Sequence, residues 1–343
     1  MNGDRPLLEI DGLHLGLHTA QGVVHALRGV TLHVRPGEVL AVVGESGCGK
    51  SVTMQGVLGL FQPWQIAYRS GRALFQGRDL LTLTEQALRR IRGAQIGMVF
   101  QDPMTSLTPT LTIGQQIGEA LLAHRRIAPG EVRRRVIALL EQVGVPHPQV
   151  RAAQYPFQLS GGLRQRALIA AALAGGPSLL IADEPTTALD VTIQAQILDL
   201  LRSLQRASGM AVILVTHDLG VVAEIAHRVA VMYAGQIVEE GTVEQVLRRP
   251  AHPYTWGLLD CLPRLDAAEG RLRSIRGQPP HLMTEIVGCA FAGRCPHAME
   301  VCVEHAPPQF PAGDGHRSAC WLLHPSAEPV ARRTRLTTGT TRG

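Results

Sequence analysis

The chain has 343 residues, 45% of them apolar, so it can bury a substantial core and has room for two or three domains. Its 33 basic and 28 acidic side chains leave a formal net charge of +5, which is too small to indicate a nucleic-acid partner by itself. No apolar run reaches the roughly 18 residues that a membrane span requires, and residues 1–12 lack the pattern of a secretory signal, so we expect a folded, soluble chain in the cytoplasm.

The N-terminal part of the chain predicts two antiparallel strands, followed by a third strand and a helix. Short apolar stretches at 8–15 and 24–34 favour the antiparallel pair. A compact apolar run at 38–43 then ends at Gly44, and a helical pattern follows from 51 to 60. A loop between a strand and the start of a helix is well placed to bind phosphate.

This loop matches the pattern G-x-x-x-x-G-K-[ST] of phosphate-binding loops. It consists of Gly44, Glu45, Ser46, Gly47, Cys48, Gly49, Lys50 and Ser51. In such a loop the backbone amides point at the phosphates, the lysine reaches the β and γ phosphates, and the serine hydroxyl binds Mg²⁺. Lys50 is the only lysine among the 33 basic residues, which indicates a role that arginine cannot take. The motif therefore predicts a nucleotide site.

The rest of the chain alternates strands and helices as far as about residue 247. Strands are predicted at 96–100, 179–182 and 211–215, and helices within 113–144, 161–174 and 193–207. This alternation predicts a mostly parallel sheet with helices on both faces.

Four polar side chains come at the ends of predicted strands: Gln101, Asp183, Glu184 and His217. The carboxyl ends of parallel strands meet at the edge of the sheet where ligands bind, so we expect these side chains near the phosphate loop. A nucleotide site that hydrolyses needs a carboxylate for the metal and a group that activates water. Asp183 and Glu184 point to opposite sides of their strand and can supply both.

A further helix start with two glycines lies between the phosphate loop and the acidic strand. In the stretch 159–165, Leu-Ser-Gly-Gly-Leu-Arg-Gln, Ser160 is expected to cap the helix, while Gly161 and Gly162 expose amides that can bind an anion. With the phosphate loop and the acidic strand, this stretch resembles the signature of the ATP-binding subunits of ABC transporters. The resemblance implies an α/β fold, the ABC-type P-loop ATPase, with a RecA-like core, an antiparallel β subdomain and a helical subdomain, plus a small Cys-rich C-terminal domain.

The expected domains follow from this resemblance. The core with its β subdomain covers 1–101 and 166–247, and the helical subdomain with the signature covers 102–165. A C-terminal extension covers 248–325, and 326–343 is expected to be a flexible tail.

The resemblance also implies roles for the site residues. Two subunits enclose two ATP molecules, each between the phosphate loop of one subunit and residues 160–162 of the other. Glu184 would be the general base, and His217 would contact the γ-phosphate. Gln101 would bind Mg²⁺, together with Ser51 and Asp183, and couple the site to the membrane subunits. The loop 187–190 would cross the seam between the two subunits.

Leu163 and Thr187 depart mildly from the family pattern, where methionine and serine are common, and a clearer departure lies in the first strands. The aromatic side chain that stacks on adenine is missing from the first strands, where Leu17, His18 and His25 stand instead. We expect His18 or an aliphatic side chain to replace it.

The stretches 100–109, 183–196 and 252–255, the last leading to Leu262 and Pro263, are similar to the dipeptide and oligopeptide importers of this family. The resemblance implies an ATPase that energises peptide uptake and lies at the cytoplasmic face of the inner membrane. Its partners would be a second homologous ATP-binding subunit, two transmembrane permease subunits and, indirectly, an extracytoplasmic peptide-binding protein, with no nucleic acid. Relatives import nickel complexes, glutathione or antibiotics, so the solute stays open.

Four of the six cysteines are spaced C-x5-C-x6-C-x17-C: Cys289, Cys295, Cys302 and Cys320. Four thiolates can hold Zn²⁺ or an iron–sulfur cluster, and the spacing lacks the C-x2-C pairs that are usual in zinc ribbons. The importers that the chain resembles carry a [4Fe–4S] cluster here, which favours the cluster, in a structural role, over zinc. Cys48 and Cys261 are expected to bind no metal.

Two other function classes fit the sequence less well. A soluble ABC ATPase that acts on ribosomes or DNA would carry two fused phosphate loops or a long coiled-coil insertion, and the sequence has neither. An iron–sulfur electron carrier would not need Glu184 and His217. Co-purification with a membrane complex, or with ribosomes or DNA, separates the first two classes.

Overall fold

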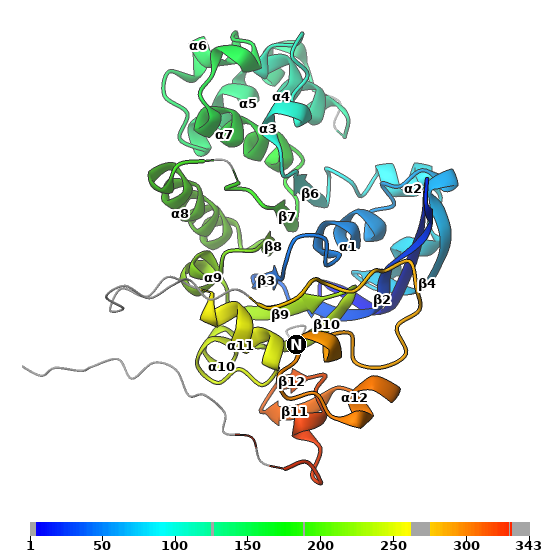
Figure 1. The fold of residues 1–343 in the computed structure, drawn as a ribbon. Helices are drawn as coiled ribbons and strands as arrows, with labels where there is room; N and C mark the ends of the chain where they lie inside the picture. The colour runs from blue at the N-terminus through cyan, green and yellow to red at the C-terminus, as the bar shows by residue number, and fades with distance from the viewer. Residues whose placement is uncertain (1–4, 125–126, 188, 262–274, 329, 331–343) are drawn as a thin grey trace, which may run out of the picture.

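Two sheets and a layer of helices make up the protein, described by a computed structural model for residues 5–124, 127–187, 189–261, 275–328 and 330 (Figure 1). Several sequence predictions lie outside these residues: Ala188 of the predicted seam loop, Leu262 and Pro263, and nearly all of the predicted tail. Within the described part, no helix combines the length and the apolarity needed to cross a membrane.

The main sheet has eight strands in the order β11-β12-β10-β9-β3-β8-β7-β6. Its parallel part consists of β9 (Arg228–Tyr233), β3 (Val39–Val43), β8 (Ala211–Thr216), β7 (Leu179–Asp183) and β6 (Ile96–Val99). Three antiparallel strands extend it: β10 (Gln236–Thr242), β12 (His316–Ser318) and β11 (Phe310–Gly313). The alternating pattern predicted β3, β8, β7 and β6, but neither β9 nor this extension.

Alternate residues of the parallel strands face two different cores. In β7, Leu179 and Ile181 pack with residues of β1, β2, β4 and α1 (Lys50–Val57). Leu180 and Ala182 pack on the opposite side with α7 (Gly161–Leu173) and α8 (Val191–Ser208). Because successive side chains of a strand point to opposite faces, a continuous apolar run is what a sheet buried on both sides requires.

The second sheet is antiparallel, in the order β2-β1-β4-β5, and lies against α1 (Figure 1). Its strands are β1 (Leu8–Thr19), β2 (Gly22–Val34), β4 (Ile66–Phe75) and β5 (Arg78–Asp79), and α2 (Glu85–Arg89) follows them. The first two strands were predicted as an antiparallel pair, and the pairing is observed. The strands β4 and β5 were not predicted from the sequence.

A group of helices projects from the sheet at the top of Figure 1. It consists of α3 (Pro103–Ser106), α4 (Ile113–Leu122), α5 (Pro129–Gln142), α6 (Pro148–Ala152) and the N-terminal part of α7. The periodicity at 113–144 corresponds to two helices because α5 begins at Pro129, and a proline disfavours helical backbone in the residue before it. Where α7 ends, Gly175 packs so closely that a Cβ would lie 1.9 Å from the carbonyl oxygen of Gly93.

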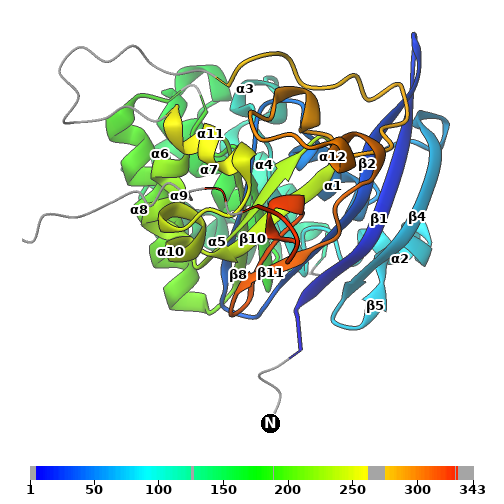
Figure 2. The ribbon, with the colours of Figure 1, turned by 60° about the horizontal axis from the view of Figure 1, so that its bottom comes forward.

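The remaining helices are α9 (Leu219–Ile225), α10 (Val243–Arg248), α11 (Pro253–Asp260) and α12 (Glu300–Glu304). The C-terminal region packs on the core: β12 pairs with β10, and the amide of His25 in β2 donates to the carbonyl of Leu282 at 2.7 Å (Figures 1 and 2). Phe291 and Tyr254 share one apolar cluster with Val43 of the main sheet. The described C-terminal residues therefore share a core with the main sheet and do not support a separate Cys-rich domain.

Candidate functional site

The phosphate loop joins β3 to α1, as the sequence predicted. Gly44 has a φ of 156°, and a Cβ at this position would lie 2.1 Å from the carbonyl oxygen of Met232. Only glycine fits so close an approach to a neighbouring strand. Gly49, with a φ of 108°, precedes the first residue of α1, so the loop turns directly into a helix N-terminus.

Lys50 lies inside this loop and is 5% exposed. Its ammonium donates to the carbonyl oxygens of Gly44 at 2.8 Å and Glu45 at 3.0 Å. These bonds hold the charge at the mouth of the loop and keep the loop curled. A slender ammonium fits there, whereas a planar guanidinium fork is larger and rigid.

Ser51 and Asp183 meet beside Lys50. The Ser51 hydroxyl donates to Oδ1 of Asp183 at 2.8 Å, and Asp183 is 2% exposed. Burial raises the pKa of Asp183 above its usual range, and the charge of Glu184 raises it further, while the bond from Ser51 and the charge of Lys50 oppose the shift. A hydroxyl and a carboxylate are hard oxygen ligands of the kind Mg²⁺ prefers.

Glu184 lies at the centre of three polar contacts. Gln101 donates to its Oε2 at 3.1 Å, and the hydroxyl of Thr187 donates to the same oxygen at 2.8 Å. Nδ1 of His217 lies 3.3 Å from Oε1. The glutamate side chain is 12% exposed and the histidine 61%. The structure thus brings Gln101, Glu184 and His217 together, and it adds Thr187, which sequence reasoning had placed only in the seam loop.

The backbone of Glu184 has a φ of 46°, in the left-handed region. A non-glycine residue pays for this conformation in backbone strain, which persists where the surrounding structure enforces it. Here the Glu184 amide donates to the carbonyl of Val215 in β8 at 2.8 Å, which fixes the turn at the end of β7. The carboxylate therefore has a defined direction.

The expected Mg²⁺ ligands are only partly assembled. Ser51 and Asp183 touch each other, but Gln101 donates to Glu184 instead. Among the described residues, no three His, Cys, Asp or Glu side chains are grouped closely enough to hold a metal ion. A Mg²⁺ ion bound mainly by phosphates and water needs only one or two protein ligands, so the Ser51 and Asp183 pair fits it.

Ser160, Gly161 and Gly162 stand at the start of α7, away from these groups. Ser160 occupies the N-cap position, but its side chain makes no capping hydrogen bond, so the expected side-chain cap is wrong. Both Ser160 and Gly161 are exposed. No hydrogen bond in the described part of the chain joins these three residues to the phosphate loop.

An aromatic side chain lies where the sequence seemed to lack one. Tyr68 of β4 packs on His25 of β2, with ring centroids 5.7 Å apart. It lies across Gly16 of β1, where a Cβ would be 2.2 Å from the Tyr68 ring. Sequence reasoning missed Tyr68 because β4 was not predicted. A glycine inside a strand was the available signal, since it marks a close approach of another group.

Two further residues missed by sequence reasoning contact the phosphate loop from the C-terminal region. The Arg294 guanidinium pairs with the carboxylate of Glu45, and the Tyr254 hydroxyl accepts a hydrogen bond from the Glu45 amide. Both lie beyond residue 248, where the sequence indicated only an extension.

The six cysteines are free thiols. Burial raises the pKa of Cys295 to about 11 and that of Cys320 to about 12. The charges of Cys289, Cys295 and Cys302 also raise the pKa of Cys320. The amide of Cys289 donates to the carbonyl of Cys302 at 2.7 Å, so these two cysteines lie on adjoining segments. The four thiols are nevertheless not grouped tightly enough for a single metal ion, within the residues that the structure describes.

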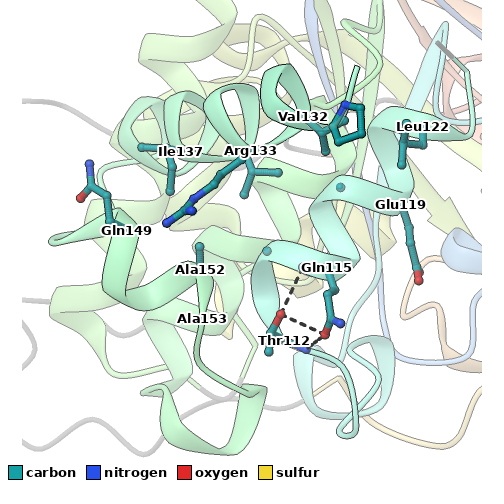
Figure 3. A pocket seen from close by; sticks show the side chains of 14 residues that line it. Thr112, Gln115, Glu119, Leu122, Val132, Arg133, Ile137, Gln149, Ala152 and Ala153 are labelled. Atoms are coloured by element: carbon teal, nitrogen blue, oxygen red, sulfur yellow. Dashed lines mark hydrogen bonds between the residues drawn. The ribbon is translucent and has the colours of Figure 1, made fainter. Parts of the chain in front are cut away.

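A hollow of about 470 Å³ lies on the projecting helices, between α4, α5 and α6 (Figure 3). Leu122 and Val132 give it apolar walls, and Glu119, Arg133 and Gln149 supply polar groups around them. None of its lining residues belongs to the phosphate loop. It is therefore a second surface feature, distinct from the nucleotide site.

Comparison with known proteins accounts for both the core and the C-terminal region. A family model described as ABC transporter matches residues 27–187, and one described as Oligopeptide/dipeptide transporter, C-terminal region, matches residues 238–302. The dipeptide transport ATP-binding protein DppD of Bacillus subtilis is 52% identical over 322 residues, which cover 94% of this chain and 96% of DppD. The chain belongs to the ATP-binding proteins of ABC transporters. The oligopeptide transport ATP-binding protein OppD of the same organism is 51% identical, covering 94% of this chain and 91% of OppD.

Solved structures of the ABC family agree with this fold. A dimeric ATP-binding cassette in a post-hydrolysis state, bound to ADP and Pi, matches with a TM-score of 0.62 and 29% identity, covering 69% of this chain and 98% of that chain. CbiO1 of Clostridium perfringens, part of an ABC transporter complex, matches with a TM-score of 0.61 and 29% identity, covering 72% of this chain and 92% of that chain. The predicted ABC-type ATPase fold with an antiparallel β subdomain is confirmed.

Proposed function

We propose that this chain is the ATP-hydrolysing subunit of an importer that takes up dipeptides or oligopeptides, and that it works at the cytoplasmic face of the membrane. The observation that carries the catalytic part is Glu184, held by Gln101, Thr187 and His217 at a strand end beside the phosphate loop. The peptide class is supported by the match over nearly the whole chain to dipeptide and oligopeptide transport proteins.

ATP binds with its phosphates in the loop 44–51. Lys50 then exchanges its bonds to the carbonyls of Gly44 and Glu45 for bonds to the β and γ phosphates. Ser51 and Asp183 would hold Mg²⁺, which would neutralise phosphate charge. The raised pKa of Asp183 reflects a buried carboxyl that lacks a full positive partner, and such a group suits a cation site.

Hydrolysis proceeds by attack of water on the γ-phosphorus. Glu184 accepts a proton from the water as the new oxygen–phosphorus bond forms, and the bond from the γ-phosphorus to the bridging oxygen breaks. The electron pair stays on ADP, where the developing charge faces the Lys50 ammonium. Gln101 and Thr187 orient the carboxylate by donating to one oxygen, and exposed His217 reaches the γ-phosphate from the edge of the site.

The second half of each nucleotide site comes from another subunit. Ser160 and Gly161 are exposed at the start of α7, with amides that can bind phosphate oxygens but no bond to the chain's own phosphate loop. We infer that they bind the nucleotide of a homologous ATP-binding partner. A matching solved structure is a dimeric ATP-binding cassette with ADP and Pi, which supports this arrangement.

The hollow on the projecting helices is the proposed contact with one of the two permease subunits. Its apolar walls and polar rim suit a short amphipathic helix from a cytoplasmic loop of the permease (Figure 3). The extracytoplasmic peptide-binding protein would act through the permease and not touch this chain. Nickel complexes, glutathione and antibiotics stay as alternative solutes, because solute contacts belong to the other subunits.

The four cysteines are the proposed ligands of a [4Fe–4S] cluster. Zn–S bonds of about 2.3 Å in a tetrahedron would draw the sulfur atoms to about 3.8 Å from one another, and the described thiols form no such group. In a [4Fe–4S] cluster each thiolate binds a different iron, so the sulfur atoms stand farther apart, which fits four neighbouring thiols better. When bound, the cluster would supply a structural link between the segments that carry Cys289, Cys295, Cys302 and Cys320.

Anaerobic purification tests the cluster. Brown protein that absorbs near about 400 nm, with about four irons per chain, is the expected result. Colourless protein with one zinc per chain would show that the four cysteines bind zinc and not a cluster.

The test of the catalytic proposal is Glu184→Gln in the assembled transporter. We expect ATP affinity to be retained while hydrolysis falls about 100- to 10,000-fold, since a positioned general base contributes about that factor. Glu244→Gln, at a glutamate that is 70% exposed, is the control and should hydrolyse normally. Near-normal hydrolysis by Glu184→Gln would remove the glutamate from this role. Uptake of defined dipeptides by the assembled transporter would support the proposed transport function. Co-purification with ribosomes or DNA instead of permease subunits would contradict it.

A further inference from the structure

Arg294 reaches from the four-cysteine region into the phosphate loop. It lies in the chain between Cys289 and Cys295, and its guanidinium forms a two-pronged ion pair with Glu45, the second residue of the loop. Nη1 lies 2.6 Å from Oε2 and Nη2 lies 2.9 Å from Oε1. The side chain of Arg294 is 6% exposed and that of Glu45 is 27% exposed. A paired geometry of this kind, largely shielded from water, is the strong form of an ion pair.

The guanidinium is itself held in place on every side. Its Nε donates to the carbonyl of Arg276 at 3.0 Å, and its two Nη atoms also reach the Tyr233 hydroxyl at 3.2 Å and the carbonyl of Ile275 at 3.4 Å. It lies over the rings of Tyr233 and Phe291, 5.8 and 5.9 Å from their centroids. These contacts use the planar fork of arginine, which a lysine ammonium cannot reproduce.

Glu45 transmits this position to the phosphate site. Its backbone amide donates to the Tyr254 hydroxyl at 2.8 Å, so the C-terminal region holds Glu45 at both the side chain and the backbone. Its carbonyl accepts from the Lys50 ammonium at 3.0 Å. The residue that the C-terminal region holds is therefore also a residue that the phosphate-binding lysine contacts.

We propose that Arg294 is a positioning residue of the nucleotide site. Through its ion pair with Glu45, it fixes the phosphate loop and neutralises the Glu45 carboxylate. This inference rests on the proposed role of the loop 44–51 in ATP binding. Without Arg294, a carboxylate would stand unpaired beside the triphosphate, and the loop would lose an anchor. Both effects weaken the binding of Mg-ATP more than they slow the chemical step.

The test compares Arg294→Gln and Arg294→Lys with the unaltered full chain. We expect the Kd for Mg-ATP to rise about 10- to 100-fold for the glutamine variant and less for the lysine variant, which keeps the charge but loses the fork. In the assembled transporter the KM for ATP should rise by the same factor, while kcat changes less than about threefold, because Glu184 is untouched.

Arg92→Gln is the matched control. Arg92 also forms a two-pronged pair with a glutamate, Glu85, and bonds to the carbonyls of Leu58 and Gly59, but it does not touch the phosphate loop. It should leave the Kd unchanged. If Arg294→Gln fails to fold, judged by far-UV circular dichroism, the lysine variant carries the comparison.

Lys50→Ala separates this inference from the proposed site. If Lys50→Ala keeps its affinity for Mg-ATP, the loop is not the nucleotide site and both proposals fail. If Lys50→Ala loses affinity while both Arg294 variants bind as tightly as Arg92→Gln, the site stands and the positioning role of Arg294 is refuted. A rise in Kd confined to the Arg294 variants and Lys50→Ala supports both.

Discussion

His252 makes the attachment of the C-terminal region sensitive to pH. The side chain is 1% exposed and lies at the N-cap of α11, where its Nδ1 accepts from the amide of Tyr254 at 3.0 Å. Burial lowers its pKa from 6.5 to about 3. Asparagine is a good N-cap residue and does not titrate, so His252→Asn removes the charge change and keeps an acceptor for the helix.

The size of the effect follows from the shift. Between pH 6.5 and about 3, His252 binds a proton in the unfolded segment but stays neutral in the folded one. The folded segment therefore has its full stability above pH 6.5 and loses stability as the pH falls below this value. At about 1.36 kcal/mol per pH unit, the region loses about 2 kcal/mol between pH 7 and pH 5, which is about a 30-fold rise in its opening equilibrium constant.

Hydrogen exchange of the α11 amides in the full chain, corrected for the intrinsic exchange rate at each pH, measures this opening. The native chain should show the 30-fold rise, to order of magnitude, and His252→Asn should show a clearly smaller one. The variant loses some packing at every pH, which raises its opening equilibrium constant throughout. The readout is therefore how steeply this constant changes with pH, and not its value at any one pH. His305→Asn, at a histidine that is 69% exposed, should keep the native slope. Equal slopes for His252→Asn and the native chain would refute the reasoning.

Three further changes test other parts of the structure. Ser51→Ala removes the hydroxyl paired with Asp183, so half-maximal ATPase activity should need roughly tenfold more Mg²⁺ in a titration, and an unchanged requirement would contradict the assignment. Leu122→Arg, in the hollow, should reduce co-purified permease about tenfold without changing ATP affinity, whereas Trp64→Arg, at a more exposed apolar residue outside it, should not. Gly175→Ala meets backbone and should cost about 1–3 kcal/mol in urea unfolding, while Gly130→Ala, in open space within α5, should be neutral or gain up to about 1 kcal/mol.

The sheet edge could be predicted from the sequence because parallel strands impose a simple geometry. Buried apolar runs locate the strands, and the residue after each run lies at the carboxyl edge of the sheet. Gln101, Glu184 and His217 were placed together on this ground, and they are in contact in the structure. The left-handed backbone of Glu184 could not be predicted, since the neighbouring strand enforces it and no local preference does.

Contacts between distant segments could not be predicted from the sequence for a different reason. Tyr68 lies on β4, whose exposed residues give a weak strand pattern, so its position beside His25 depends on a pairing that no local signal records. The antiparallel extension through β12 has the same origin, since strands as short as His316–Ser318 carry almost no periodicity. Such elements form because a neighbouring edge is available to pair with them.

Lys50 and Arg294 show how composition governs what a sequence can reveal. Lys50 stands out because every other basic residue is an arginine, so its rarity alone points to a constraint. Arg294 is one of many arginines and has no rarity to mark it, although its burial and its paired bond to Glu45 are just as specific. An abundant residue type becomes informative only through its surroundings. Arg92 is also paired on both prongs but lies away from the site, so what distinguishes Arg294 is that its buried guanidinium pairs with a residue of the phosphate loop.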